Sequence, residues 1–224
     1  AAIAAAKGYR IILTMPETMS VERRNILKAY GAEIVLTEGA KGMKGAIEMA
    51  EKLVKEKGYF MPQQFENKAN PQKHYETTAE EILRDIPDID VFVAGVGSGG
   101  TIVGVGRKLK ELKPDVKVVA VEPEKSPVLS GGNPGAHKIQ GIGAGFVPGV
   151  YSKDIVDEIF EVSDEDSYKV AKEFATKEGV LIGISSGAAL YAGIEIAKKL
   201  GRDKKIVVIS PDGGEKYFSS GLYD

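Results

Sequence analysis

The sequence predicts an α/β fold in which helices cover parallel β-sheets. Short apolar runs typical of strands alternate with segments of helical spacing along the 224 residues, and there is no internal repeat. The apolar runs are continuous rather than alternating with polar residues, as expected for strands covered on both faces. A glycine-rich loop at 95–101 joins one such strand to a helix. In sheets of this kind, ligands bind beyond the carboxyl ends of the strands.

The first sixty residues predict five elements. Pro16 stops the first strand, and Ser20 is a residue type that caps a helix. Gly31 and Gly58 each end a helix. The expected elements are strands at 9–15, 34–36 and 59–61, a helix that follows Ser20 and runs to Tyr30, and a helix at 44–57.

The remaining sequence continues the same alternation. Thr78 and Glu81 have the spacing of a capping box and predict the start of a helix. Ser185 and Ser186 lie where a strand passes into a helix, so Ser186 can cap that helix while Ser185 turns its hydroxyl toward a ligand. The expected elements are strands at 91–94, 116–121, 159–162, 181–184 and 206–210 and helices at 102–109, 163–178 and 186–200.

Two segments lack this alternation. Residues 62–75 are polar, and we expect them to join two lobes. Residues 123–149 hold seven glycines together with apolar residues such as Ile139 and Phe146. Long loops inside a compact domain are usually functional or disordered, and the apolar residues argue against disorder. The segment 123–149 is therefore predicted to be a mobile active-site loop.

The loop at 95–101, with sequence GVGSGGT, predicts an anion site. Glycines at a strand-to-helix junction free backbone N–H groups, and the following helix adds the positive end of its dipole. Gly95, Gly97 and Gly100 also satisfy the G-x-G-x-x-G pattern, and Glu122 follows Gly100 by twenty-two positions. By spacing alone, a nicotinamide-dependent Rossmann oxidoreductase stays open beside an enzyme with a smaller phosphate-bearing cofactor.

Composition excludes several classes of function. A formal net charge of −2 gives no general attraction to nucleic acid or to an anionic membrane, and no apolar stretch is long enough to span a bilayer. The absence of cysteine excludes thiol catalysis and cysteine-ligated metals, and it agrees with a cytoplasmic location. The two histidines, His74 and His137, have no metal-site spacing and are expected on the surface or in loops. No metal site is predicted.

Five long segments carry a family resemblance. They are LTMPETMSVERR at 13–24, QQFENKANPQKHYETT at 63–78, GVGSGGT at 95–101, VEPEKSPVLSGGNPGAHKIQGIGAGFVP at 121–148 and GISSGAA at 183–189. The chain resembles the cysteine synthases (O-acetylserine sulfhydrylases), which are pyridoxal phosphate (PLP) enzymes of the two-lobed, tryptophan synthase β-subunit-like fold type II. The resemblance implies that the phosphate in the glycine loop belongs to PLP and displaces the dinucleotide interpretation.

The resemblance also implies roles for individual residues. Gly97, Ser98, Gly99, Gly100 and Thr101 would hold the cofactor phosphate. Ser185 would bond to the pyridine nitrogen, Gln64 with Phe65 would contact the substrate's amino-acid end, and the segment Gly141, Ile142, Gly143 would line the closing cleft. The implied reaction replaces the acetate of O-acetylserine by sulfide to give cysteine. The implied partners are these small molecules, a second copy of the chain and serine acetyltransferase.

The departures from the family pattern limit these inferences. Ser98 stands where the family usually has threonine, and Asp212 with Gly213 stands where many relatives have two serines. No lysine lies in a context like that of the family's Schiff-base lysine, so no catalytic residue is assigned. We therefore expect an N-terminally truncated chain, inactive alone, with residues 1–65 in a smaller lobe and 66–224 in a larger PLP-binding lobe.

Three alternatives to cysteine synthase stay open at this point. A related PLP β-replacement enzyme, such as cystathionine β-synthase or β-cyanoalanine synthase, would share most of the quoted segments. The nicotinamide-dependent oxidoreductase rests on glycine spacing alone. A non-catalytic binding module would account for a chain in which no Schiff-base lysine is recognised.

Overall fold

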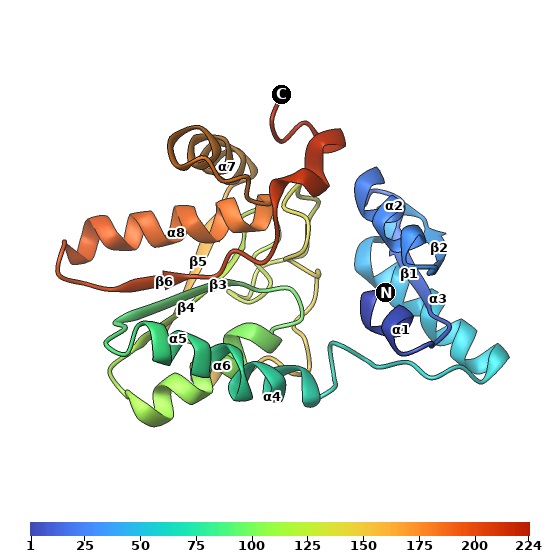
Figure 1. Cartoon of the computed structure of the whole chain (residues 1–224), viewed down its shortest axis with the longest axis horizontal. Coiled ribbons are helices and arrows are strands. Elements are labelled where there is room, and N and C mark those ends of the chain that lie inside the picture. The colour runs from blue at the N-terminus through green and yellow to red at the C-terminus, as the bar shows by residue number, and fades with distance from the viewer. The chain divides into compact units, whose positions relative to one another are not determined.

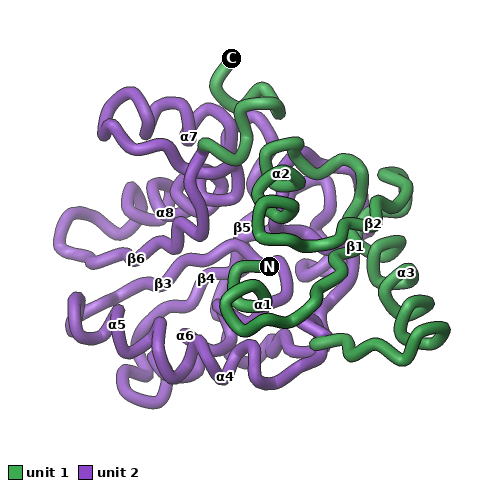
Figure 2. The backbone as a smooth tube through the Cα atoms, turned by 45° about the vertical axis from the view of Figure 1, so that its right-hand side comes forward, with its two compact units in different colours: residues 1–62, 215–224 green, residues 63–214 purple.

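The computed structural model describes residues 1–224, which form two compact units. The first unit combines residues 1–62 with residues 215–224, and the second comprises residues 63–214 (Figure 2). The expected lobes, 1–65 and 66–224, differ from these units by three residues at the junction and by the last ten residues. The division into functional lobes stays a proposal. None of the helices combines the length and the apolar character needed to cross a membrane.

The first unit is built on a two-stranded parallel sheet. Strand β1 (Ile12–Pro16) pairs with β2 (Glu33–Thr37), and Ile12 lies opposite Glu33. The helical elements are α1 (Ala2–Ala6), α2 (Val21–Ala29), η1 (Gly39–Lys41) and α3 (Gly42–Lys57) (Figure 1), and the 3-10 helix η3 (Gly214–Ser220) leads into the last residues.

Side chains of α2 hold the last residues of the chain. The hydroxyl of Tyr217, a buried side chain, accepts a hydrogen bond of 2.9 Å from Arg23 Nη2. Glu22 accepts two more, of 2.8 Å from the backbone N–H of Ser219 and 2.6 Å from its hydroxyl. These contacts explain why residues 215–224 belong to the first unit, although they lie far from it in sequence.

The second unit is a four-stranded parallel sheet with helices on both faces (Figure 1). The strand order is β5-β4-β3-β6. Helices α7 and α8 lie on one face, and α4, α5 and α6 lie on the other. The bounds are α4 (Ala69–Glu76), α5 (Thr78–Asp85), β3 (Val91–Gly95), α6 (Gly100–Leu112), β4 (Lys117–Pro123), η2 (Lys153–Ile155), β5 (Glu158–Val162), α7 (Asp164–Glu178), α8 (Ile184–Leu200) and β6 (Ile206–Val208).

A buried apolar core joins α6 to the sheet. Phe92 and Val118 of the strands are fully buried, as are Ile102 and Leu109 of α6. The burial of all but the last residue of β3 confirms the prediction from continuous apolar runs that the sheet is covered on both faces. Because all four strands are parallel, their carboxyl ends share one edge of the sheet, where the glycine-rich loop begins.

Most predicted elements are present, some with shifted ends. Ser20 caps α2 by accepting a hydrogen bond from Arg23 N, and Ser163 caps α7 in the same way from Asp166 N. Strand β1 starts three residues later than expected and includes Pro16 at its end, where the missing N–H breaks no interior ladder bond. Residues 123–149 contain no helix or strand beyond the end of β4, as predicted for a long loop.

Five local predictions were wrong. Residues 59–61 form no strand because no other strand pairs with them, and Phe60 is 87% exposed. The expected strand at 181–184 is reduced to one bridge, Ile182 to Gly213, because α8 already begins at Ile184 with Gly183 as its N-cap. Ser186 therefore lies inside the helix and does not cap it.

The other two errors concern the segment before β3. Helix α5 has Thr77, not Thr78, as its N-cap, and no side chain caps it. The hydroxyl of Thr78 instead lies 3.0 Å from Nδ1 of His74. The polar segment 62–75, expected only as a connection, contains most of α4.

Candidate functional site

The glycine-rich loop joins the carboxyl end of β3 to the first turn of α6. The N-cap of α6 is Gly99, with a left-handed φ of 87°, and no side chain caps the helix. The first backbone N–H groups of a helix have no acceptor within the helix, so an uncapped end leaves them available to a ligand. The partial positive charge of the same end favours an anion. The geometry could therefore hold an anion, and the anion site stays a prediction.

The long loop packs directly on the glycine loop. The carbonyl oxygen of Gly141 would lie 2.5 Å from a Cβ atom built on Gly97, so the two backbones approach as closely as glycine allows. The N–H of Gly143 donates a hydrogen bond of 3.0 Å to the carbonyl of Val96. Ile142 between them is buried. The segment 141–143 therefore packs against the glycine loop, and its role as a cleft lining stays a prediction.

Ser185 lies on the other side of Gly141. It is in the first turn of α8 and only 4% exposed. Its Oγ would lie 3.7 Å from a Cβ atom on Gly141. Gly141 thus contacts Gly97 through its carbonyl and faces Ser185 from its Cα. The structure brings together three segments that are far apart in sequence.

Gln64 and Phe65 differ in their surroundings. The ring of Phe65 is 8% exposed and packs edge-on against Phe146 of the long loop, with 5.0 Å between the ring centroids. Its carbonyl accepts a hydrogen bond of 2.9 Å from Val150 N. Gln64 is exposed. The geometry thus gives Phe65 a packing contact with the long loop.

Two site residues on α4 were missed in the sequence. Asn70 Nδ2 donates a hydrogen bond of 2.9 Å to Ser98 Oγ. His74, one helical turn later, lies with Nε2 3.2 Å from Thr101 Oγ1. Burial lowers the pKa of His74 below its ordinary value of 6.5. His74 lies on a helix and not in a loop, at intermediate exposure, and its spacing of four residues from Asn70 is the signal that could have placed both on one helical face.

Glu122 is engaged by its own loop. Its side chain is 2% exposed, and its carboxylate accepts hydrogen bonds of 2.8 Å from Leu129 N, 2.9 Å from Ser130 N and 2.6 Å from the hydroxyl of Ser130. A carboxylate with three internal donors is not placed to bind a ribose. The small cavity beside Glu122 and Gly97 has a volume of about 10 Å³, room for about one water molecule.

Comparison with known proteins identifies the family. The model of the family described as "Pyridoxal-phosphate dependent enzyme" matches residues 1–212. The chain belongs to the pyridoxal-phosphate dependent enzymes. It is 55% identical to a cysteine synthase from Staphylococcus aureus over 223 residues, which are 99% of this chain and 72% of that protein. Family membership and the engagement of Glu122 together overturn the nicotinamide-dependent interpretation.

Solved structures agree with this assignment. Cysteine synthase from Entamoeba histolytica is 48% identical, with a TM-score of 0.91 over 98% of this chain and 66% of that one. An O-acetylserine dependent cystathionine β-synthase from Helicobacter pylori is 38% identical, with a TM-score of 0.95 over 99% of this chain and 73% of that one. These comparisons confirm the α/β fold of type II. The chain spans about two thirds to three quarters of the length of these relatives.

The residues of the site fit the family's cofactor. A phosphate group needs several donors in one place, and the uncapped end of α6 supplies backbone N–H groups there, beside the hydroxyls of Ser98 and Thr101. The pyridine nitrogen needs one partner, and the buried hydroxyl of Ser185 is a neutral one. Chemistry of this donor set suits PLP, although the individual roles of these residues stay predictions.

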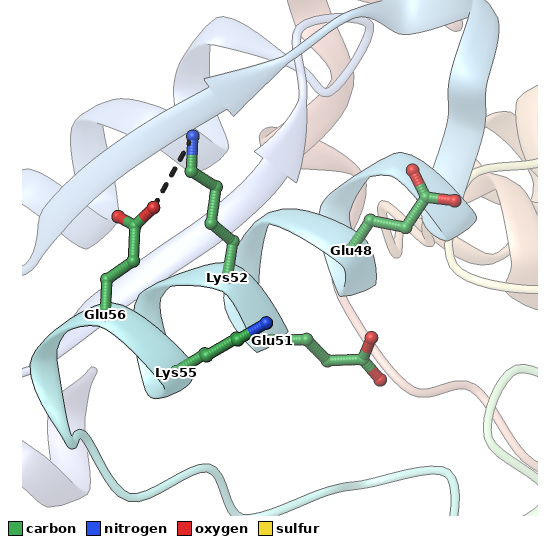
Figure 3. A pocket seen from close by; sticks show the side chains of 5 residues that line it. All are labelled: Glu48, Glu51, Lys52, Lys55 and Glu56. Atoms are coloured by element: carbon green, nitrogen blue, oxygen red, sulfur yellow. Dashed lines mark ion pairs between the residues drawn. The ribbon is translucent and has the colours of Figure 1, made fainter.

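A hollow on the first unit offers no comparable site. It lies along α3 and has a volume of about 600 Å³. Its lining consists of charged side chains. Lys52 and Glu56 form an ion pair of 3.9 Å there, and both side chains are exposed (Figure 3). Exposed ion pairs of this kind are well solvated and contribute little to the stability of the fold. The full lining is Glu48, Glu51, Lys52, Lys55 and Glu56.

Proposed function

We propose that the protein is a cysteine synthase that replaces the acetate of O-acetylserine by sulfide, releasing L-cysteine and acetate. The observation that carries this proposal is the position of Gly141. It contacts both the glycine loop at Gly97 and the surroundings of Ser185, in a chain that is 55% identical to a cysteine synthase. Phosphate donors, a pyridine partner and a cleft lining thereby meet in one place within the second unit.

The cofactor would be held by the glycine loop, the first turn of α6 and Ser185 of α8. Gly97, Ser98, Gly99, Gly100 and Thr101 bind its phosphate through backbone N–H groups and two hydroxyls. Bound PLP supplies an electron sink for charge that develops on the amino-acid substrate. Ser185 donates its hydroxyl hydrogen to the pyridine nitrogen. A neutral hydroxyl does not hold a proton on the ring as a carboxylate does, so the electron sink is tempered and favours β-elimination.

The substrate is bound between Gln64 and the long loop. The carboxamide of Gln64 is exposed and can bond to the amino-acid end of O-acetylserine. Gly141, Ile142 and Gly143 cover the reacting groups and exclude water. Ile142 contributes an apolar surface, and the hydrogen bond from Gly143 N to Val96 O keeps the segment against the glycine loop.

The test is an assay of the purified protein that carries this chain. We expect an absorbance band of protein-bound PLP and formation of cysteine from O-acetylserine and sulfide. A second assay with homocysteine in place of sulfide distinguishes a cysteine synthase from a cystathionine β-synthase. A cystathionine β-synthase would form cystathionine faster than cysteine. Absence of PLP binding, absence of cysteine formation, or formation of cystathionine faster than cysteine would contradict the proposal.

We further propose that the protein acts as a homodimer in the cytoplasm and associates with serine acetyltransferase. The resemblance to cysteine synthases supports the partners, and the absence of cysteine from the chain agrees with the location. Light scattering of the purified protein, alone and mixed with serine acetyltransferase, tests both associations. A monomer that does not bind serine acetyltransferase would contradict both proposed associations.

A further inference from the structure

The carboxamide of Asn70, on α4, connects two parts of the proposed site. Its Nδ2 donates two hydrogen bonds of 2.9 Å, to the carbonyl of Gln64 and to Ser98 Oγ. Its Oδ1 occupies the space in which a Cβ atom on Gly100 would lie. One side chain therefore touches the segment assigned to the substrate and two residues assigned to the cofactor phosphate.

The carbonyl of Gln64 determines which way the amide of Asn70 faces. A carbonyl oxygen can only accept hydrogen bonds, so the NH₂ group of Asn70 must be on that side. The same NH₂ group then donates to Ser98 Oγ, and the Ser98 hydroxyl acts as the acceptor. Its own O–H is consequently left to donate to a third group. A hydroxyl oxygen that already accepts a hydrogen bond has its O–H free to donate, which suits it to bind an anion.

We propose that Asn70 is a positioning residue, which fixes the Ser98 hydroxyl as a donor to the cofactor phosphate and ties this donor to the backbone of Gln64. The inference rests on the proposed function, since it concerns the same PLP site. Gly100 is part of the device because any side chain there would displace the Asn70 carboxamide. Asn70 itself is held by a hydrogen bond of 3.0 Å from its N–H to Asn67 O.

A double-mutant cycle separates this role from a general loss of structure. The affinity of the apoprotein for PLP is measured by fluorescence titration in the wild type, Asn70→Ala, Ser98→Ala and the double variant. A hydrogen bond to a charged group is worth about 10- to 100-fold in affinity. We expect about a tenfold loss for Ser98→Ala, a several-fold loss for Asn70→Ala, and little further loss when Asn70→Ala is added to Ser98→Ala. Equal losses from Asn70→Ala in both backgrounds, or none, would overturn the inference.

Two further measurements make the test robust. The ³¹P resonance of bound PLP reports the phosphate environment directly, and it should shift similarly in Asn70→Ala and Ser98→Ala. Asn70→Asp keeps the shape but has no N–H, so Ser98 must donate to the new carboxylate instead of the phosphate. It replaces Asn70→Ala should that variant not fold, and we expect a loss of at least tenfold. A wild-type phosphorus shift in both Asn70 variants would exclude the role.

The matched control is Gln72→Ala. Gln72 is exposed on the same helix, and its carboxamide bonds only to Glu76, at 2.9 Å. We expect unchanged PLP affinity and an unchanged phosphorus shift in this variant. Titration of the wild type with inorganic phosphate separates the two proposals. Failure of the wild type to bind PLP or phosphate contradicts the proposed function, whereas wild-type binding with an additive cycle contradicts only the inference about Asn70.

Discussion

Helices α6 and α7 begin at the same edge of one sheet, but only the N-terminus of α7 is capped by a side chain. Each follows a parallel strand, β3 for α6 and β5 for α7. The start of α7 is closed by its own residues: Ser163 Oγ accepts from Asp166 N at 3.0 Å and donates to Asp166 Oδ2 at 2.7 Å. Three acidic residues lie in its first turn.

The start of α6 has neither a side-chain cap nor an acidic residue in its first turn. The helix dipole is available to an anion only where the chain itself does not use it. At α7 the acidic side chains interact with the positive end of the helix dipole and would repel a phosphate. At α6 no side chain does so, and the backbone N–H groups can bind a ligand. At this edge of the sheet, α6 therefore differs from α7 in having an N-terminus that its own side chains leave open to an anion.

The largest expected effect is a loss of PLP affinity when a side chain blocks the N-terminus of α6. Gly99→Val places a branched side chain at a φ of 87°, with its Cβ 3.5 Å from Tyr151, and displaces the backbone N–H groups. Loss of two or more bonds to a charged group corresponds to a fall in PLP affinity of about 100-fold or more. Titration of the apoprotein with PLP measures this.

The control for Gly99→Val is Gly179→Val at the end of α7. Gly179 also has a left-handed φ, 71°, but nothing lies within 4 Å of an added Cβ atom. We expect a loss of stability there without a loss of PLP affinity. Unchanged affinity in Gly99→Val, or an equal loss in Gly179→Val, would show that α6 does not bind the phosphate.

A second prediction concerns Ser185, in the first turn of α8. Ser185→Ala removes one neutral hydrogen bond, worth about 1 kcal/mol, and should lower kcat/KM about fivefold. Ser185→Asp should abolish cysteine formation, because a carboxylate favours a protonated pyridine ring. Steady-state kinetics with O-acetylserine and sulfide measure both variants. Wild-type kinetics in Ser185→Asp would refute the contact.

The closed terminus of α7 gives a smaller effect, on stability alone. Ser163→Ala removes the cap and should lower the free energy of unfolding by about 1 kcal/mol, as measured by urea denaturation. PLP affinity should stay at the wild-type value, since nothing assigns a ligand to this end. A variant that lost PLP affinity without losing stability would contradict the contrast between the two helices.

The smallest effect is a pH dependence from His74. Burial lowers its pKa below 6.5, so the unfolded chain takes up the proton first as the pH falls. Its contribution to stability is complete above about pH 6.5 and declines below it, toward the lower pKa of the folded state. His74→Gln should show a shallower decline of the unfolding free energy between about pH 7 and pH 5. Parallel curves for the two proteins would contradict the burial of His74.

Local signals explain which parts of the site were predictable. The glycines of the loop at 95–101 and the pair Ser185, Ser186 stand out in the sequence because each set follows a short apolar run. Continuous apolar runs likewise predicted the parallel sheet and its burial. The three-residue strand expected at 59–61 failed because a strand needs a partner, and pairing is a property of the fold and not of the segment.

Long-range packing explains what was missed. Asn70 and His74 lie in a polar segment without apolar periodicity, and α4 is held in place by its approach to α6. A Cβ atom on Gly104 would overlap the carbonyl of Pro71, so glycine in α6 is what admits α4. Glu122 had the spacing of a ribose ligand, but its carboxylate is bound by Leu129 and Ser130, a pairing that no spacing rule reveals.

A crystal structure of the protein with PLP tests the central claim most directly. The account predicts density for the phosphate at the start of α6, within hydrogen-bond distance of the backbone N–H groups and hydroxyls of residues 97–101, and none at the start of α7. It also predicts the pyridine nitrogen beside Ser185 Oγ. A phosphate bound elsewhere, with the start of α6 empty, would contradict the account.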